Sequence, residues 1–227
     1  MSLPLDTIHC GDCIEFMKAL PDGCVDAVVT DPPYGINLAT NYKARGRGRL
    51  AGCSDYPPIH GDDRPFDPSP WLNYPITALC GANYYADRLP PSPRWLVWDK
   101  RDGMASNDQA DCELIWTNAK GPARVFRHRW NGMFKASERT ARRCHPTQKP
   151  IALMAWVLDQ VRVPSGGVVF DPFMGSGTTA VACIATGRHY IGCEISEDYC
   201  AIAERRLREA KGGPLFADSA ERQGAFA

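Results

Sequence analysis

The 227-residue chain has no net charge, no long hydrophobic run and no export signal. It contains 26 Lys and Arg residues against 26 Asp and Glu residues, and 44% of its residues are hydrophobic. No apolar stretch reaches the roughly 18 residues that a membrane-spanning helix needs, and residues 1–6 lack a basic segment followed by an apolar run. These absences argue against a membrane protein, a disordered chain or a coiled coil. We therefore expect one globular, cytoplasmic domain with no membrane partner.

The ten cysteines show neither the spacing of a metal site nor the setting of a disulfide framework. Cys10-Gly-Asp-Cys13 is the only CxxC sequence, whereas a structural zinc site requires a second Cys or His pair. The other cysteines are scattered along a chain of ordinary core composition. We expect reduced, mostly buried thiols and no metal ion.

The zero net charge conceals an uneven distribution of Lys and Arg along the chain. Residues 41–49 and 120–149 together hold 13 of the 26 basic residues but only one of the 26 acidic residues. Overall neutrality argues against a nucleic-acid partner, but these segments carry +12 charges and can bind phosphates with a steep salt dependence. A solvated basic face is the alternative. The predicted contacts are Lys43, Arg45, Arg47, Arg49, Arg124, Arg127, Arg129, Arg139, Arg142 and Arg143.

Hydrophobic periodicity predicts strands that alternate with helices, which is typical of a doubly wound, mostly parallel α/β sheet with helices on both faces. The expected strands span residues 7–10, 25–30, 94–98, 113–117, 124–128, 168–170 and 189–193. The expected helices span residues 13–20, 71–79, 151–161, 180–185 and 197–210. Residues 36–70 have little periodicity and form too long a connection for a compact domain, which predicts a functional or mobile loop.

Four of the predicted strands end in an acidic residue: Asp12, Asp31, Asp171 and Glu194. In such sheets, ligands bind beyond the carboxyl ends of the strands, near a topological switch point. A single acid at this position commonly caps the following helix. Four acids at one edge predict a shared ligand that carries several hydrogen-bond donors.

The loop Asp171–Thr179 contains Gly175 and Gly177, which allow the backbone to pass close to a ligand. No lysine follows Gly177 as in a phosphate-binding P-loop, and the third glycine of a dinucleotide fingerprint is absent. A nucleoside linked to an amino acid fits better, with Asp171 facing its ammonium and Glu194 its ribose hydroxyls. The alternative is that these glycines serve only helix–strand packing.

The tetrapeptide Asp31-Pro32-Pro33-Tyr34 directly follows a predicted strand. Its prolines form a stiff turn that can hold the Asp31 carboxylate and the Pro32 carbonyl toward one point, as two acceptors for an exocyclic amine. Tyr34 offers a ring on which a base removed from its duplex can stack. An ordinary strand-ending turn is the alternative interpretation.

Three motifs of the chain together resemble the DNA amino-methyltransferases that use S-adenosylmethionine. They are Asp31-Pro-Pro-Tyr34, His145-Pro-Thr-Gln-Lys-Pro150 and Phe170-Asp-Pro-Phe-Met-Gly-Ser-Gly-Thr-Thr179, in an order similar to that of the β group of this family. The resemblance implies a single Rossmann-like methyltransferase domain over residues 1–227. It also implies that Asp31, Pro32, Pro33 and Tyr34 are catalytic and that target-recognition segments are inserted within residues 36–144.

The same resemblance implies which residues bind the cofactor, S-adenosylmethionine. Asp12 and Cys13 would lie at its adenine edge and Glu194 at its ribose. The methionine part would lie against Asp171, Phe173, Gly175, Ser176, Gly177 and Thr178. The segment with His145, Thr147, Gln148 and Lys149 would close over the cofactor from the other side.

Double-stranded DNA is the partner that the resemblance implies, and N6 of a flipped adenine is the implied target. The aspartate form of the tetrapeptide goes mostly with adenine in this family. Cytosine N4 is the first alternative and an RNA substrate a further one, while a dehydrogenase and a catalytically silent DNA-binding protein also remain open. A restriction–modification enzyme and a solitary phage or prophage enzyme both fit, as a monomer or a homodimer.

Overall fold

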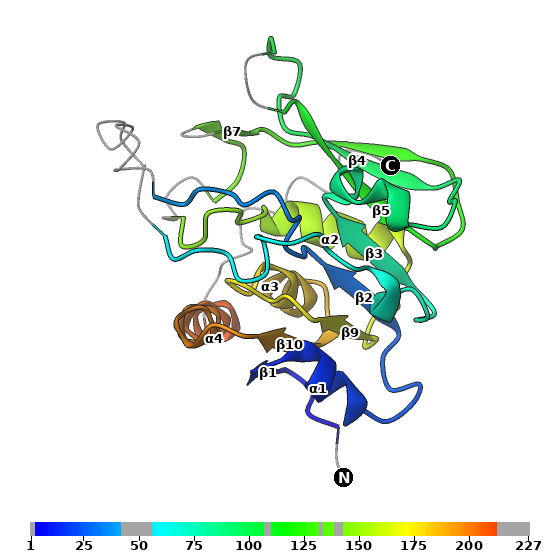
Figure 1. The fold of residues 1–227 in the computed structure, drawn as a ribbon, viewed down its shortest axis with the longest axis vertical. Helices are drawn as coiled ribbons and strands as arrows, with labels where there is room; N and C mark the ends of the chain where they lie inside the picture. Colours follow the sequence, from blue (N-terminus) through cyan, green and yellow to red (C-terminus); the bar gives the residue numbers. More distant parts are fainter. Residues whose placement is uncertain (1–2, 42–55, 107–109, 132–133, 139–142, 213–227) are drawn as a thin grey trace.

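The computed structural model of the protein describes residues 3–41, 56–106, 110–131, 134–138 and 143–212. A sheet of eight strands has the order β1-β10-β9-β2-β3-β5-β4-β6, and β7 and β8 pair separately (Figure 1). The strands are β1 Thr7–Cys10, β2 Ala27–Thr30, β3 Thr77–Cys80, β4 Trp95–Asp99, β5 Cys112–Thr117, β6 Arg124–Arg127, β7 Trp130–Asn131, β8 Phe134–Lys135, β9 Val168–Asp171 and β10 His189–Glu194. The α-helices are α1 Cys13–Lys18, α2 Ile151–Gln160, α3 Thr178–Ala185 and α4 Glu197–Gly212, and the 3-10 helices are η1 Ser69–Trp71, η2 Ala82–Tyr84 and η3 Ala86–Arg88.

The connections between the strands place a topological switch point between β9 and β2. All neighbouring strands of the large sheet are parallel, except that β5 runs antiparallel to both β3 and β4. After β9 the chain continues through α3 to β10 on one side, whereas β2 leads to β3 on the other. Because crossover connections diverge there, loops leave a crevice at the carboxyl ends of these two strands.

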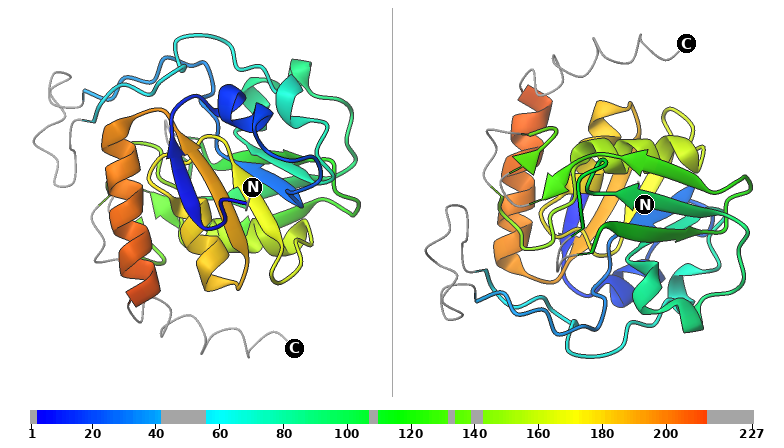
Figure 2. Two further views of the ribbon diagram at one scale, coloured as in Figure 1. Left: turned by 90° about the horizontal axis from the view of Figure 1, so that it is seen from below. Right: turned by 90° about the horizontal axis from the view of Figure 1, so that it is seen from above.

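The two faces of the sheet are covered differently. One hydrophobic cluster joins alternate residues of the strands, such as Ala27 and Val29, to α2, α3 and the end of α4. The other cluster joins the intervening residues, such as Val28, to α1, η1 and η2. Figure 2 shows the sheet with α1 on one side and α2 and α3 on the other. Helices therefore lie on both faces, and among the described residues one face is covered by a six-residue α-helix and 3-10 turns.

The predicted mostly parallel sheet is confirmed, and the strands and helices after residue 150 match their expected positions closely. The helix predicted over residues 71–79 is wrong: a 3-10 turn ends at Trp71, and β3 begins at Thr77. Pro75 explains the difference, because it has no amide hydrogen and disfavours a helical conformation at the preceding residue. The strands predicted over 113–117 and 124–128 exist as β5 and β6, but β4 lies between them.

Much of the predicted recognition region belongs to the central sheet. Strands β3, β4, β5 and β6 all lie within residues 36–144 and form its half beyond β2. The assignment of recognition segments to this region stays a prediction. In the described part of the chain, no helix is long and apolar enough to cross a membrane, and no three candidate ligands come together as a metal site.

Candidate active site

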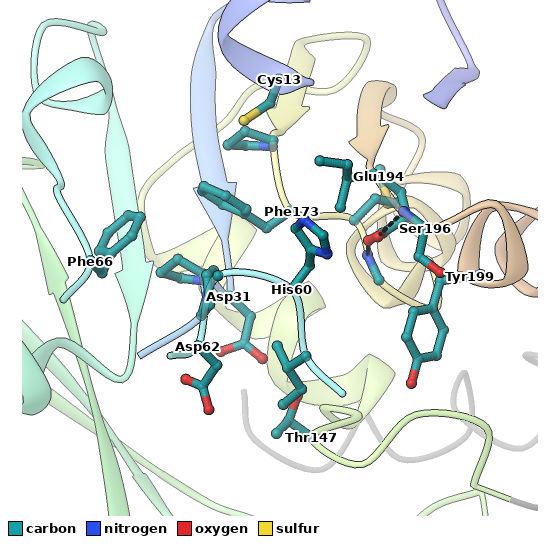
Figure 3. Close-up of a pocket in the computed structure, with 18 of the residues that line it drawn as sticks. Cys13, Asp31, His60, Asp62, Phe66, Thr147, Phe173, Glu194, Ser196 and Tyr199 are labelled. Atoms are coloured by element: carbon teal, nitrogen blue, oxygen red, sulfur yellow. Dashed lines mark hydrogen bonds between the residues drawn. The ribbon is translucent and has the colours of Figure 1, made fainter. Parts of the chain in front are cut away.

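A cavity of about 760 Å³ opens at the carboxyl ends of β1, β10, β9 and β2. All four strand-end acids, Asp12, Asp31, Asp171 and Glu194, line it, as the sequence predicted. Every predicted catalytic residue also lines it, and so does every predicted cofactor residue except Gly177. Figure 3 shows Asp31, Phe173, Glu194 and Thr147 around this space, contributed by segments far apart in the chain.

Asp12 and Glu194 each organise backbone at the cavity wall. The Asp12 carboxylate caps α1 by accepting hydrogen bonds from the amides of Ile14 at 2.7 Å and Glu15 at 3.1 Å. The Glu194 carboxylate accepts one hydrogen bond from Gly175 at 2.7 Å and another from Ser196 at 2.9 Å (Figure 3). Glu194 therefore joins the glycine loop after β9 to the loop after β10.

The two glycines of the loop after β9 have different roles. Both have positive φ, +52° at Gly175 and +81° at Gly177. Gly175 lines the cavity, where its amide binds Glu194. Gly177 does not line it, and a Cβ there would lie 3.1 Å from the Cβ of Ala203 on α4. The small size of Gly177 allows α3 and α4 to pack closely, and its assignment as a cofactor residue stays a prediction.

Asp171 is almost fully buried, with 2% of its surface exposed. Its Oδ1 accepts hydrogen bonds from the Thr30 hydroxyl at 2.6 Å and the Phe173 amide at 3.1 Å. Burial raises the pKa of Asp171 to about 6, although these donors oppose the rise. A cation bound nearby would favour the charged form, so the site fits the expected ammonium group.

The segment from His145 to Lys149 crosses the cavity from the other side. The His145 ring lies 4.5 Å from the Tyr199 ring, and burial lowers the pKa of His145 to about 3, which keeps its imidazole neutral. Gln148 holds the segment itself, since its side-chain oxygen accepts the Cys144 amide at 3.0 Å. Tyr199 lines the cavity, and its buried hydroxyl has no hydrogen-bond partner among the described residues. Such a buried orphan group fits a polar ligand.

Lys149 contacts the tetrapeptide that is predicted to be catalytic. Its Nζ lies 2.6 Å from Asp31 Oδ2 and 3.0 Å from the Tyr34 hydroxyl. The resemblance placed this lysine with the cofactor, but the structure brings its ammonium to the carboxylate that is expected to bind the target amine. Burial raises the pKa of Asp31, and the Lys149 charge opposes that rise. Lys149 therefore favours the ionised, accepting form of Asp31.

Tyr34 is held on several sides. Its hydroxyl donates a hydrogen bond to Asp31 Oδ1, and its ring stacks on Tyr84 with centroids 5.1 Å apart. Gly81 lies so close that an added Cβ would overlap the Tyr34 ring. The face of Tyr34 toward Tyr84 is therefore covered, and Tyr84 itself is 47% exposed. Sequence analysis did not single out Tyr84 or Gly81 for the site.

Asp62 fixes the loop that follows the tetrapeptide. Its Oδ1 accepts hydrogen bonds from the amides of Tyr34, Gly35 and Ile36, at 3.0, 2.9 and 3.3 Å. Its Oδ2 accepts the Leu38 amide at 2.7 Å. One buried carboxylate thus accepts hydrogen bonds from four amides within residues 34–38, which precede it in the sequence by at least 24 residues. No local sequence pattern indicates this contact, because both partners lie in irregular segments.

The predicted DNA-binding residues lie at different places. Arg124 begins β6 and Arg127 ends it, so they lie at the amino and carboxyl ends of this strand. Strand β6 runs parallel to β4, which runs in the direction of β3 and β2, so Arg127 shares the edge that carries the cavity. Arg129 follows β6 and Arg143 precedes the segment with His145. Lys43, Arg45, Arg47, Arg49, Arg139 and Arg142 lie outside the described residues.

Comparison with known proteins decides the family. Residues 91–205 match the DNA methylase family model for N6 and N4 methyltransferases. The chain belongs to this DNA methylase family. The matched stretch contains the His145–Pro150 segment, the glycine loop and Glu194, whereas the tetrapeptide Asp31–Tyr34 precedes it.

Two curated DNA methylase relatives extend the similarity over 92% of this chain. The type II methyltransferase M.HinfI of Haemophilus influenzae is 26% identical, and the match covers 70% of its length. The type II methyltransferase M.ScaI of Streptomyces caespitosus is 29% identical, with 83% of its length covered. The solved complex of M1.HpyAVI with S-adenosylmethionine shares the fold, with a TM-score of 0.54, 23% identity and coverage of 88% of this chain and 98% of that one.

Proposed function

We propose that this DNA methylase transfers a methyl group from S-adenosylmethionine to N6 of an adenine flipped out of duplex DNA. The observation that carries the proposal is the position of the Asp31 carboxylate, which lines the same cavity as the glycine loop and Glu194. A nucleoside–amino acid cofactor and an exocyclic amine both find hydrogen-bond acceptors there. S-adenosylmethionine, when bound, supplies an electrophilic methyl group on a positively charged sulfur.

The catalytic residues act by positioning and by their charge. Asp31 and the Pro32 carbonyl accept hydrogen bonds from the target amine, so that its lone pair is turned away from the base ring and toward the methyl donor. The carboxylate also stabilises positive charge as it develops on the amine nitrogen. Pro33 restricts the turn, and Tyr34 is the proposed contact for the flipped base.

The cofactor residues bind and orient the donor. Glu194 and Asp12 are the proposed acceptors for its ribose and adenine, and Asp171 is the proposed partner of its ammonium. The backbone at Gly175 and Ser176 contacts its methionine part. Phosphate contacts by the basic segments, including Arg127 at the carboxyl end of β6, would hold the DNA.

Labelled methyl transfer to genomic DNA, duplex oligonucleotides and RNA tests this proposal, followed by nucleoside analysis. We expect N6-methyl-2′-deoxyadenosine from DNA. N4-methyl-2′-deoxycytidine instead would show that cytosine is the target base, and transfer to RNA alone would show that RNA is the substrate. Both bases offer an exocyclic amine to the same acceptors, so the product identity decides between them.

Replacement of Asp31 by alanine should abolish transfer and leave S-adenosylmethionine binding in place, as measured by calorimetry. The turn residue Asp22 is exposed and provides the matched control, since Asp22→Ala should keep wild-type activity. Tyr34→Ala should weaken transfer without eliminating it. Substantial turnover by the Asp31→Ala protein would contradict the assignment of this residue.

A further inference from the structure

Lys149 lies between two carboxylates, of which only Asp31 belongs to the catalytic tetrapeptide. Its Nζ is 2.6 Å from Asp31 Oδ2 and 3.3 Å from Glu113 Oε2 on β5. The Lys149 side chain is 6% exposed, so water screens these charges poorly. Glu113 does not line the cavity and therefore cannot touch the substrate through it.

Glu113 itself joins Lys149 to a second lysine. Its Oε1 lies 3.0 Å from Lys100 Nζ, next to the end of β4. Its Oε2 is buried and forms no hydrogen bond of good geometry among the described residues, so its contact with Lys149 is an ion pair. Asp31, Lys149, Glu113 and Lys100 thus form a row of alternating charge, which leads from the cavity away from the substrate.

The charge balance of this row matters for methylation of an amine. As the bond between the amine nitrogen and the methyl carbon forms, the bond between that carbon and the donor sulfur breaks and the sulfur becomes neutral. The nitrogen takes up the positive charge and keeps it until it loses a proton to solvent. Lys149 alone would cancel the charge of Asp31 and place a cation near the reacting nitrogen, which disfavours this step. With Glu113, the three residues at the Asp31 end of the row carry one net negative charge, and the balancing charge of Lys100 lies at its far end.

We propose that Glu113 is a positioning residue for amine methylation, which holds Lys149 and restores a net negative charge beside Asp31. This inference rests on the proposed amino-methyl transfer. It gives a role to a strand residue within the predicted recognition region, where the DNA methylase motifs place none. Glu113 acts through Lys149 and Asp31 and needs no contact with DNA or cofactor.

The ionisation states support this role. Burial pushes the pKa of Glu113 upward, but Lys149 and Lys100 together bring it below its usual value, so Glu113 is charged at neutral pH. Burial also raises the pKa of Asp31, Lys149 opposes this rise, and Glu113 adds to it. The other groups that face Asp31 are the Tyr34 hydroxyl, the Cys80 thiol on β3 and the Asp171 carboxylate on β9.

Glu113 and Lys149 therefore have opposite effects on the acid limb of the pH–rate profile, where the rate falls because Asp31 becomes protonated. Removing the negative charge of Glu113 lowers the pKa of Asp31, which moves this limb to lower pH. Removing the positive charge of Lys149 raises the pKa of Asp31, which moves it to higher pH. A merely structural role for Glu113 would produce no such pair of opposed shifts.

The test compares Glu113→Gln, Glu113→Asp and Lys149→Met with the wild type in single-turnover methylation of DNA between pH 5 and pH 9. For Glu113→Gln we expect a rate about 10 to 100 times lower at pH 8, which corresponds to a barrier higher by about 1.4 to 2.7 kcal/mol. The affinities of Glu113→Gln for S-adenosylmethionine and DNA should stay within about twofold of the wild-type values. The acid limb of its pH–rate profile should move to lower pH, whereas Lys149→Met should move this limb to higher pH. Glu113→Asp should restore part of the rate.

Glu204→Gln provides the matched control, because Glu204 lies on α4 in an exposed pair with Arg208. It should keep the wild-type rate and pH profile. An unchanged rate for Glu113→Gln, or a loss matched by equal losses of binding and thermal stability, would overturn the inference while leaving the proposed function intact. Absence of transfer by the wild type to any nucleic acid would overturn both.

Discussion

Gly81 sets the position of Tyr34, and its replacement by alanine separates this effect from ordinary destabilisation. The residue lies between β3 and η2 with φ of +65°. A Cβ at this position would lie 2.1 Å from Cε1 and 2.2 Å from Cζ of Tyr34. Since carbon atoms in ordinary contact are about 3.5–4.0 Å apart, the Tyr34 ring must retreat by more than about 1 Å.

Two costs follow from this geometry. The left-handed conformation costs a residue with a Cβ about 1–2 kcal/mol, and forcing a methyl group into packed space costs a further 1–3 kcal/mol or so. Movement of a positioning group by about 1 Å can lower a reaction rate about 100-fold. We expect Gly81→Ala to lose about 2–5 kcal/mol of unfolding free energy, on the sum of those costs. Its single-turnover methylation rate should fall about 10- to 100-fold.

Gly166→Ala provides the matched control for backbone strain. Gly166 has a similar φ of +74°, but nothing lies within 4 Å of an added Cβ. This variant should lose about 1–2 kcal/mol in urea denaturation and keep the wild-type methylation rate. A wild-type rate in Gly81→Ala, or an equal loss of rate in Gly166→Ala, would refute the idea that Gly81 positions Tyr34.

Two further predictions concern buried carboxylates. Asp62→Ala removes the acceptor for four amides of the tetrapeptide and the loop after it. We expect this variant to lose about 2–4 kcal/mol of unfolding free energy in urea denaturation and to methylate more slowly. Asp63→Ala, at the exposed neighbouring residue, should change neither the stability nor the rate. The pKa of Asp171 is raised to about 6, so this carboxyl group destabilises the fold increasingly as pH rises from about 4 to 6. Asp171→Asn should therefore be more stable than the wild type at pH 8, by up to about 3 kcal/mol, and the difference should vanish near pH 4. A variant that is less stable at pH 8 would contradict the sign of this shift.

The sequence predicts the site well where a residue directly follows a strand. Asp31, Asp171 and Glu194 were placed at one edge from strand ends alone, because parallel neighbouring strands bring their carboxyl ends together. The same rule could not identify Asp62, whose partners are set by two irregular segments. It also could not reveal Glu113, because β5 runs antiparallel and pairs with β4 in an order that no local pattern determines.

Errors in the fold prediction have similar physical causes. Apolar spacing favoured a helix over residues 71–79, but Pro75 and the burial of all four residues of β3 between two sheet neighbours favour a strand. Within one motif, Gly175 lines the cavity, whereas a Cβ at Gly177 would meet Ala203 on α4. Motif position alone does not distinguish a glycine that approaches a ligand from one that approaches a helix.

The placement of β3 to β6 in the central sheet bears on attempts to change the DNA target of such an enzyme. Gly81 and Glu113, which contact Tyr34 and Lys149, both lie in this half of the molecule. A chimaera that exchanges the whole of residues 77–127 would replace supports of the catalytic centre together with any specificity determinants. Grafts confined to the connecting loops would leave these supports unchanged, so target specificity and catalytic rate could be engineered separately.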